Sequence, residues 1–131
     1  MKKAGLTVMD VSLLPNENMD YEKKLKKKVY SHLSKNFDHD VVERLLETAV
    51  VSMEGYINAI ETDMECRRIQ GLLNKFHAFQ GMLANLGLEA EAKRAKEIQK
   101  HLQQGILQPV TAEISVFVMD MSHFSRLLQI K

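Results

Sequence analysis

The sequence contains little glycine, proline or cysteine. Its 131 residues include 6 glycines, 2 prolines and 1 cysteine. Glycine and proline at this level are too scarce for a disordered chain or for a β-sandwich with many tight turns. The single cysteine, Cys66, has no partner for an internal disulfide and cannot build a cysteine-based metal site, so we expect a protein of the reducing cytoplasm. These absences favour a helical domain.

Long hydrophobic runs are also missing. No apolar stretch approaches the ~18 residues of a membrane-spanning helix. The content of 45% apolar and 27% charged residues is typical of a globular protein, and the length suits one domain. The net charge of +1 hides an asymmetry, because residues 1–35 hold eight lysines and four acidic residues, whereas residues 36–131 hold ten basic and thirteen acidic residues. A basic leader therefore precedes a mildly acidic body.

The first 37 residues divide into two parts. Residues 1–19 lack a sustained hydrophobic period and include a turn-like cluster at 15–18, so we expect a flexible arm there. From Asp20, a suitable N-cap, apolar residues recur every four positions among lysines, which predicts a short amphipathic helix over 20–37. Its apolar positions are Tyr21, Leu25, Val29, Leu33 and Phe37, and its lysines are Lys23, Lys24, Lys26, Lys27 and Lys28.

Residues 38–129 show four further helical patterns, in which apolar residues alternate at spacings of three and four. Asp38 is a suitable first N-cap, Gly87 and Gly105 can end helices, and Pro109 suits a first helical turn. The run 62–65 has the form of a capping box, so we expect a helix to begin there. The expected core positions are Val42, Leu46, Ala49, Met53, Tyr56 and Ile60; Ile69, Leu72, Phe76, Phe79, Leu83 and Leu86; Leu88, Ala92, Ala95, Ile98 and Leu102; and Val110, Ile114, Phe117, Met121, Phe124 and Leu128.

These patterns predict the fold class. Helices of about 20 residues joined by short links pack as antiparallel neighbours. We therefore expect an all-α fold: an antiparallel up-down-up-down four-helix bundle over about 38–129, with an additional N-terminal amphipathic helix. Residues 20–131 are expected to form a single domain and a monomer.

His77 is the main candidate for chemistry. At ~100° per residue along a helix, it lies at the rim of the apolar face centred on Phe76, and Gly81 lies one turn further on. A glycine inside a helix costs about 1 kcal/mol relative to alanine, and here it removes side-chain bulk beside the imidazole. On one interpretation Gly81 admits a neighbouring helix and His77 is a satisfied rim residue. On the other, a partner approaches the ring closely.

The run 76–87, FHAFQGMLANLG, resembles the signature of histidine-containing phosphotransfer (HPt) domains. That signature has a histidine, any residue, an apolar residue, usually a lysine, and a glycine; after four further residues come an apolar residue and a second glycine. The motif stands on the second helix of the expected bundle, where the family carries it. The matching residues are His77, Phe79, Gly81, Leu86 and Gly87.

The resemblance implies that His77 is a phosphoacceptor, which exchanges a phosphoryl group with the aspartate of a response-regulator receiver domain through Nε2. It implies a phosphocarrier and not an enzyme with an ATP-dependent kinase site, with receiver domains and hybrid histidine kinases as partners. No cofactor of the chain's own is expected, and Mg²⁺ comes with the receiver. Phosphoryl transfer passes through a loose transition state, so it requires mainly positioning and electrostatics from the protein.

Position 80 departs from the family pattern, because Gln80 stands where lysine is usual. A glutamine amide can donate to a phosphoryl oxygen but carries no positive charge, so slower transfer or a shorter-lived phosphohistidine is a consequence to test. An antiparallel next helix would bring residues near position 96 level with His77. Those residues are Lys93, Lys96, Gln99 and Lys100, of which Gln99 is the expected orienting partner.

The docking surface for a receiver is expected to surround His77, with Gly81 providing clearance. We expect no nucleic-acid and no membrane partner. The expected docking residues are Gln70, Leu73, Asn74, Ala78, Met82, Ala84 and Gln99.

Other chemistry finds little support in the sequence. A di-iron bundle needs two Glu-x-x-His pairs, whereas the one carboxylate-x-x-His run here is Asp120 to His123, so no metal site is expected. The motifs of zinc peptidases, P-loop NTPases and α/β-hydrolases are missing. Two alternatives remain open. One is a degenerate HPt bundle that binds receivers or kinases without carrying phosphate, and the other is a helical adaptor whose basic leader helix binds membrane or nucleic acid.

Overall fold

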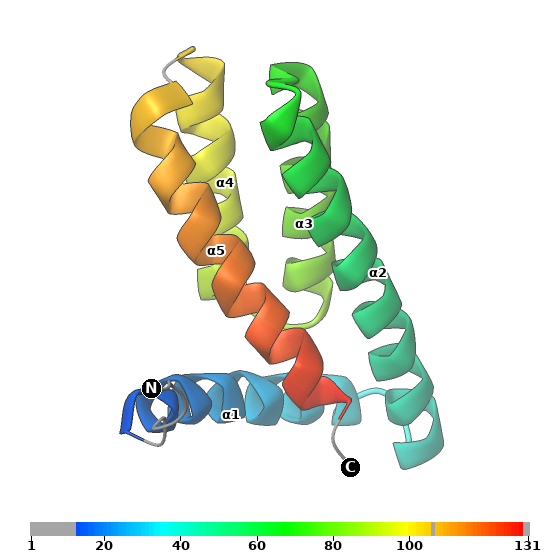
Figure 1. The fold of residues 1–131 in the computed structure, drawn as a ribbon. Coiled ribbons are helices and arrows are strands. Elements are labelled where there is room, and N and C mark those ends of the chain that lie inside the picture. The colour runs from blue at the N-terminus through cyan, green and yellow to red at the C-terminus, as the bar shows by residue number, and fades with distance from the viewer. Residues whose placement is uncertain (1–12, 106, 130–131) are drawn as a thin grey trace.

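The computed structural model describes residues 13–105 and 107–129, and within these ranges the chain forms five helices and no strand. Figure 1 shows four of them as an up-down-up-down bundle, with the first lying across one end. The predicted all-α bundle with an additional N-terminal helix is therefore confirmed. The helices are α1 (Leu13–Ser34), α2 (His39–Glu65), α3 (Ile69–Asn85), α4 (Glu89–Gln103) and α5 (Leu107–Leu128).

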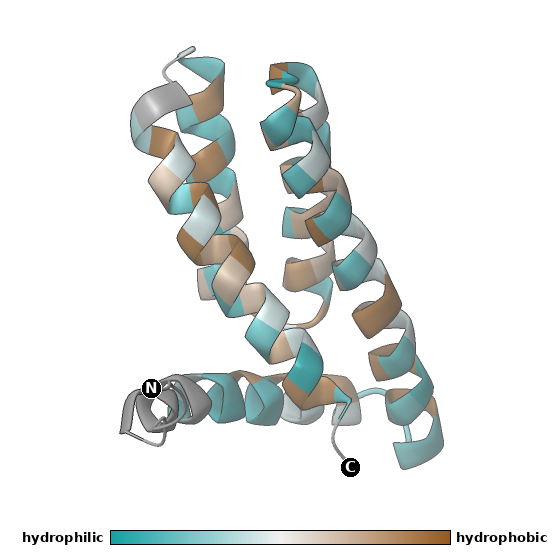
Figure 2. Ribbon diagram, viewed as in Figure 1, coloured by the Kyte–Doolittle hydropathy of each residue, from teal (hydrophilic) through white to brown (hydrophobic). Residues whose placement is uncertain are grey.

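The core is built from the apolar positions that the spacing predicted. All the expected positions on α2 to α5 are buried, except Tyr56 and Ile69, which are half-buried at its edge. Figure 2 shows these hydrophobic residues interleaved with hydrophilic ones along each helix. The ring of Phe117 packs against Phe76 and Phe79, with centroids 5.6 and 5.2 Å apart. Two buried aromatic residues therefore anchor α3, the helix that carries His77.

Helix α1 closes the end of the bundle at which the α3–α4 turn lies (Figure 1). Its Leu25, Val29 and Leu33 are buried in the common core. Gly87 in the turn fits closely under α1, since a Cβ there would lie 2.5 Å from the Cγ atom of His32. The apolar stripe of α1 is thus covered by the bundle, whereas the side chains of Lys23, Lys24, Lys27 and Lys28 are exposed. None of the helices in the described ranges is long and apolar enough to cross a membrane.

The bounds of α1 differ from the prediction. The helix begins at Leu13, seven residues before the predicted start, and Asp20 lies inside the helix instead of capping it. Pro15 is tolerated because N–H groups of a first helical turn have no acceptor within the helix. The remainder of the expected arm, residues 1–12, lies outside the described residues. Phe37 lies beyond the helix end at Ser34 and is exposed, so it is not the last core position.

The turns between the bundle helices follow the predicted caps, with one exception. Asp38 Oδ1 accepts a hydrogen bond from the Val41 N–H at 3.2 Å, and Gly87 and Gly105 have φ of 84° and 76°. The helix start predicted at 62–65 is wrong, because α2 continues through it to Glu65. Thr62 Oγ1 donates to the Asn58 carbonyl at 3.1 Å, an arrangement of a helix interior, and the chain turns instead at Arg67, with φ of 55°.

Polar contacts also hold α1 against the bundle. The Tyr21 hydroxyl donates to Glu91 Oε2 at 2.7 Å, and burial followed by this hydrogen bond raises the pKa of Tyr21. Arg94 donates to the same hydroxyl at 3.3 Å. Tyr30 donates to Glu43 at 2.5 Å, and this bond, with burial, raises the pKa of Tyr30 to about 12. These contacts link α1 to α4 and to α2.

A buried carboxylate lies where α1 meets α5. Glu22 is buried, and its Oε2 atom lies 3.3 Å from Nδ1 of His123. Burial raises the pKa of the Glu22 carboxyl, while the neighbouring His123 ring opposes the rise. A raised pKa in the folded state means that this group favours folding at low pH, and the contribution is lost as the pH rises through that pKa.

Candidate functional site

His77 lies near the middle of α3 with its side chain exposed to solvent. Its neighbours Phe76 and Phe79 are buried and fix the helix from the core side. Within the described residues, no hydrogen bond or ion pair takes either nitrogen of the His77 ring. The interpretation of His77 as a satisfied rim histidine therefore does not fit the structure. The ring is open to an incoming molecule.

Gly81 lies one turn after His77 and has open space around it. A Cβ at Gly81 would have no atom of the described residues within 4 Å apart from its immediate backbone surroundings. No neighbouring helix needs this glycine, so the packing interpretation of Gly81 is wrong. Glycine in a helix interior is unfavourable by ~1 kcal/mol relative to alanine, and here packing within the described chain gives no compensation. What Gly81 does provide is free space beside the imidazole.

Gln80 is held by Gln99 of α4, which the sequence analysis expected to orient His77. Gln99 Nε2 donates to Gln80 Oε1 at 2.7 Å and to the Ala95 carbonyl at 3.3 Å. Both hydrogens of the Gln99 amide are therefore used, and the carbonyl end of Gln80 is turned toward α4. The amide nitrogen of Gln80 has no hydrogen-bond acceptor among the described residues and keeps both hydrogens for a ligand. Gln99 thus contacts Gln80, and no bond joins it to His77.

Most of the predicted docking residues share the exposed side of α3 with His77. Gln70 Nε2 donates to Asn74 Oδ1 at 3.1 Å on this side. Ala78 and Met82 are half-buried and lie further round the helix toward α2, because each residue advances ~100°. The exposed residues of this stripe are Gln70, Asn74, His77, Gly81 and Ala84, and Leu73 is half-buried at its α4 edge.

The short turn at Gly87 sets which part of α4 lies level with His77. The two helices are antiparallel and meet at this turn, so residues equally far from Gly87 lie at about the same level (Figure 1). His77 comes ten residues before Gly87, which makes its level on α4 about position 97, close to the expected position 96. Lys96 is exposed at this level.

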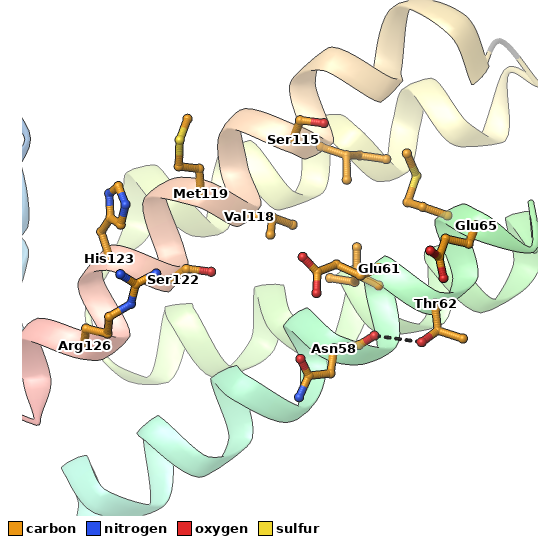
Figure 3. Close-up of a pocket in the computed structure, with 13 residues that line it drawn as sticks. Asn58, Glu61, Thr62, Glu65, Ser115, Val118, Met119, Ser122, His123 and Arg126 are labelled. Carbon is orange, nitrogen blue, oxygen red and sulfur yellow. Dashed lines mark hydrogen bonds between the residues drawn. The ribbon is translucent and has the colours of Figure 1, made fainter. Parts of the chain in front are cut away.

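A hollow lies on another part of the molecule, between α2 and α5 (Figure 3). It has a volume of about 780 Å³ and its side chains are mixed in character, with Glu61 on α2 and Arg126, Met119 and His123 on α5. No group of three or more His, Cys, Asp or Glu residues that would hold a metal ion occurs in the described ranges. This groove lies on α2 and α5 and contains none of the residues around His77.

The comparisons with known proteins agree with the fold. The family model of the Hpt domain matches residues 44–128, which is more than half of the chain. None of the curated proteins searched matches. Among solved structures, the histidine-containing phosphotransfer protein B (HptB) from Pseudomonas aeruginosa PAO1 has the same fold, with a TM-score of 0.68 and 24% identity over 77% of this chain and 87% of that one. The chain therefore belongs to the Hpt domain family, whose members are phosphocarriers and not kinases.

Proposed function

We propose that this protein is a phosphorelay intermediate whose phosphoacceptor is His77, and that its partner is a receiver domain carrying a phosphorylated aspartate. The observation that carries the proposal is the exposed, unpartnered imidazole beside a helical glycine that packing does not require. Hpt domains in general relay phosphate with receiver domains. Hybrid histidine kinases are the second class of proposed partner. We propose that the protein acts in the cytoplasm and as a monomer.

The proposed transfer is a displacement at phosphorus. The Nε2 lone pair of a neutral His77 ring attacks the phosphorus of the acyl phosphate, and a nitrogen–phosphorus bond forms as the acyl oxygen–phosphorus bond breaks. The carboxylate of the partner leaves with the bonding electron pair. The imidazolium that results then loses its Nδ1 proton to water. The reverse sequence returns the phosphoryl group to a second receiver, and the receiver supplies the Mg²⁺.

Gln80 and Gln99 have distinct proposed roles in this step. Gln80 donates its free amide N–H groups to a phosphoryl oxygen, and a hydrogen bond to a charged group contributes ~1.5–3 kcal/mol. Gln99 is a positioning residue, because it binds the carbonyl end of Gln80 and so fixes which end faces His77. Gly81 leaves room for the incoming phosphoryl group and for the receiver surface.

The leader-helix alternative is disfavoured by the position of α1. An amphipathic helix that binds lipid inserts its apolar face into the membrane. In α1 that face, formed by Leu25, Val29 and Leu33, is buried in the core. Salt-sensitive binding to liposomes or DNA, lost on deletion of residues 1–37, would support that alternative.

The test is a transfer assay with a labelled phosphoreceiver. Wild-type protein should take up acid-labile label, and His77→Gln should take up none while keeping its helical content and thermal stability. Label retained by the variant would refute the assignment of His77. Normal receiver affinity of the wild type with no label on His77 would identify the degenerate HPt bundle, which binds without carrying phosphate.

A further inference from the structure

The interface between α1 and the bundle is mixed in character. Leu25, Val29 and Leu33 bury their side chains in the common core, and the carboxylate of Glu22 is buried beside them. Helix α1 lies across one end of the four-helix bundle, so most of the core, which α2 to α5 share, lies away from it (Figure 1). An element held by few buried apolar side chains opens at a smaller free energy than the whole fold. A single buried charge in this interface can therefore decide how firmly α1 is docked.

The buried carboxylate of Glu22 is poorly compensated. Its Oε2 atom has no hydrogen bond of good geometry from the residues that the structure describes. Across the interface, Nδ1 of His123 on α5 lies 3.3 Å from this oxygen. An ionised carboxylate without hydrogen bonds is unfavourable in a protein interior unless a cation or a proton neutralises it. Either a proton on the carboxyl or a positive charge on the ring would do so, which makes the two groups one titrating pair.

The ring of His123 gives this pair access to solvent. Its side chain is 33% exposed, whereas that of Glu22 is 6% exposed. The ring also lines the groove between α2 and α5, where Figure 3 shows it at one end. Protons can therefore reach the Glu22–His123 pair without movement of α1.

Two further charges of α5 face Glu22, one on either side of His123. Asp120 raises the pKa of Glu22 and Arg126 lowers it, so the two oppose each other. Asp120 is itself paired with Arg94 of α4, at 3.0 Å. Burial has the largest influence on the Glu22 carboxyl and raises its pKa. The carboxyl thus binds its proton more tightly when α1 is docked.

The other polar contacts of α1 involve groups that keep their protons at neutral pH. Tyr21 donates to Glu91 of α4 at 2.7 Å and Tyr30 donates to Glu43 of α2, and the pKa of each tyrosine is raised. Lys26 donates to a backbone carbonyl of α5 at 3.3 Å. Tyrosine and lysine side chains ordinarily lose their protons only near pH ~10. These contacts therefore do not weaken as the pH rises toward neutrality.

We propose that the Glu22–His123 pair makes the docking of α1 pH-dependent: α1 docks with uptake of a proton by this pair, and a rise in pH releases α1 while α2 to α5 stay folded. A group that binds its proton more tightly in the docked state stabilises docking at low pH, and this contribution is lost as the pH rises. Loss of the positive charge from His123 acts in the same direction, because it leaves the buried carboxylate without a counter-charge. The inference does not depend on the proposed function.

The experiment measures hydrogen exchange of the backbone amides of the full chain from about pH 4 to pH 8, the range in which glutamate and histidine titrate. Wild type and Glu22→Gln are compared at each pH, so that the intrinsic pH dependence of exchange cancels. Glutamine has nearly the same size and cannot ionise. The ratio of wild-type to variant exchange in α1 should rise with pH, by at most about tenfold per unit, because one proton is linked to docking. His123→Gln, which removes the counter-charge, should open α1 more than wild type does at the upper end of the range.

Two controls accompany these variants. His101→Gln removes a ring that lies 2.6 Å from Glu113 in a pair that joins α4 to α5 without α1, and it should keep the wild-type pH profile of α1. Exchange in α3 should give the same ratio at every pH, since the bundle stays folded.

Three results would overturn the inference. One is the same pH profile of α1 in wild type and Glu22→Gln. The second is less protection of α1 in Glu22→Gln than in wild type at neutral pH, because a neutral side chain should dock at least as well. The third is the opening of α1 and α3 together as the pH rises, which would indicate unfolding of the whole domain.

Discussion

The two glycines inside α3 have opposite surroundings. A Cβ at Gly71 would lie 2.5 Å from Oδ2 of the buried Asp63 on α2, so any side chain there forces the Asp63 carboxylate or the helices to shift. A Cβ at Gly81 would meet nothing within 4 Å. The first glycine is explained by the packing of α2 on α3. The second has no such explanation within the described chain, and its distinguishing neighbour is the exposed ring of His77.

A third helical glycine shows how far this comparison goes. Gly55 on α2 is exposed and also has open space around the position of a Cβ. Open space alone therefore does not mark a functional glycine. The histidine one turn away is what separates Gly81 from Gly55, and this makes Gly55 the natural control for every change at Gly81.

The largest expected effect is that of Gly81→Leu. A leucine side chain would fill the clearance beside His77, so transfer from a phosphoreceiver should fall by about 100-fold, which corresponds to ~2.7 kcal/mol of barrier. The thermal stability should stay at or slightly above that of wild type, because leucine is a better helix former than glycine. Initial transfer rates and a thermal melt measure the two effects. An unchanged transfer rate would show that the clearance argument is wrong.

The next largest effect is expected for a substitution at Gly71. Gly71→Ala should lower the free energy of unfolding by ~1–3 kcal/mol, the usual range for overpacking of a tightly packed site. Transfer by the folded protein should remain at the wild-type rate, because the affected side of α3 faces α2. Urea unfolding and the transfer assay check this pair of outcomes. Combining Gly71→Ala with Asp63→Ala should give less than the sum of the two single losses, since the double variant removes the clash.

Two alanine substitutions with smaller expected effects compare Gly81 with Gly55 directly. Gly81→Ala and Gly55→Ala should each raise the free energy of unfolding by about 0.5–1 kcal/mol, because alanine is the better helix residue and both sites have room. Only Gly81→Ala should slow transfer, by about threefold if the added methyl removes close to 0.6 kcal/mol of transition-state binding. Equal transfer rates for the two variants would remove the distinction between these glycines.

The smallest effect is expected for Gln80→Lys. Lysine at this position restores the family pattern, and the variant should transfer at the wild-type rate or up to about threefold faster, because a cation is added while the bond to Gln99 is lost. Transfer rates at low and high salt measure it. A collapse of the rate would show that the Gln80–Gln99 bond has a role beyond orienting the donor.

Periodicity predicted the bundle because burial depends on it directly. The apolar spacing on α2 to α5 located the core, and Asp38, Gly87 and Gly105 marked real helix ends since each meets a backbone requirement that few residues satisfy. The run 62–65 misled because a threonine serves equally well inside a helix when its hydroxyl binds the carbonyl four residues earlier.

The candidate site was predicted in part. The position of His77 on its helix and its separation from Gly81 follow from the sequence, because they depend on one helix alone. The residue that the Gln99 side chain contacts does not, since it depends on how long side chains of two helices pack. That is why the contact of Gln99 was placed on His77 instead of Gln80. The unused ring nitrogens of His77 likewise appear only once every neighbour is in place.

Helix α1 belongs to the folded unit of this protein although it precedes the family match. The family match begins at residue 44, yet three residues ahead of it, Leu25, Val29 and Leu33, are embedded in the common interior. Each such buried side chain contributes ~1.5–3 kcal/mol by leaving water. A fragment that began at residue 44 would expose the apolar side chains of the bundle that α1 covers. Exposed apolar surface of this kind favours self-association. Studies of partner affinity with this protein should therefore keep the leading helix.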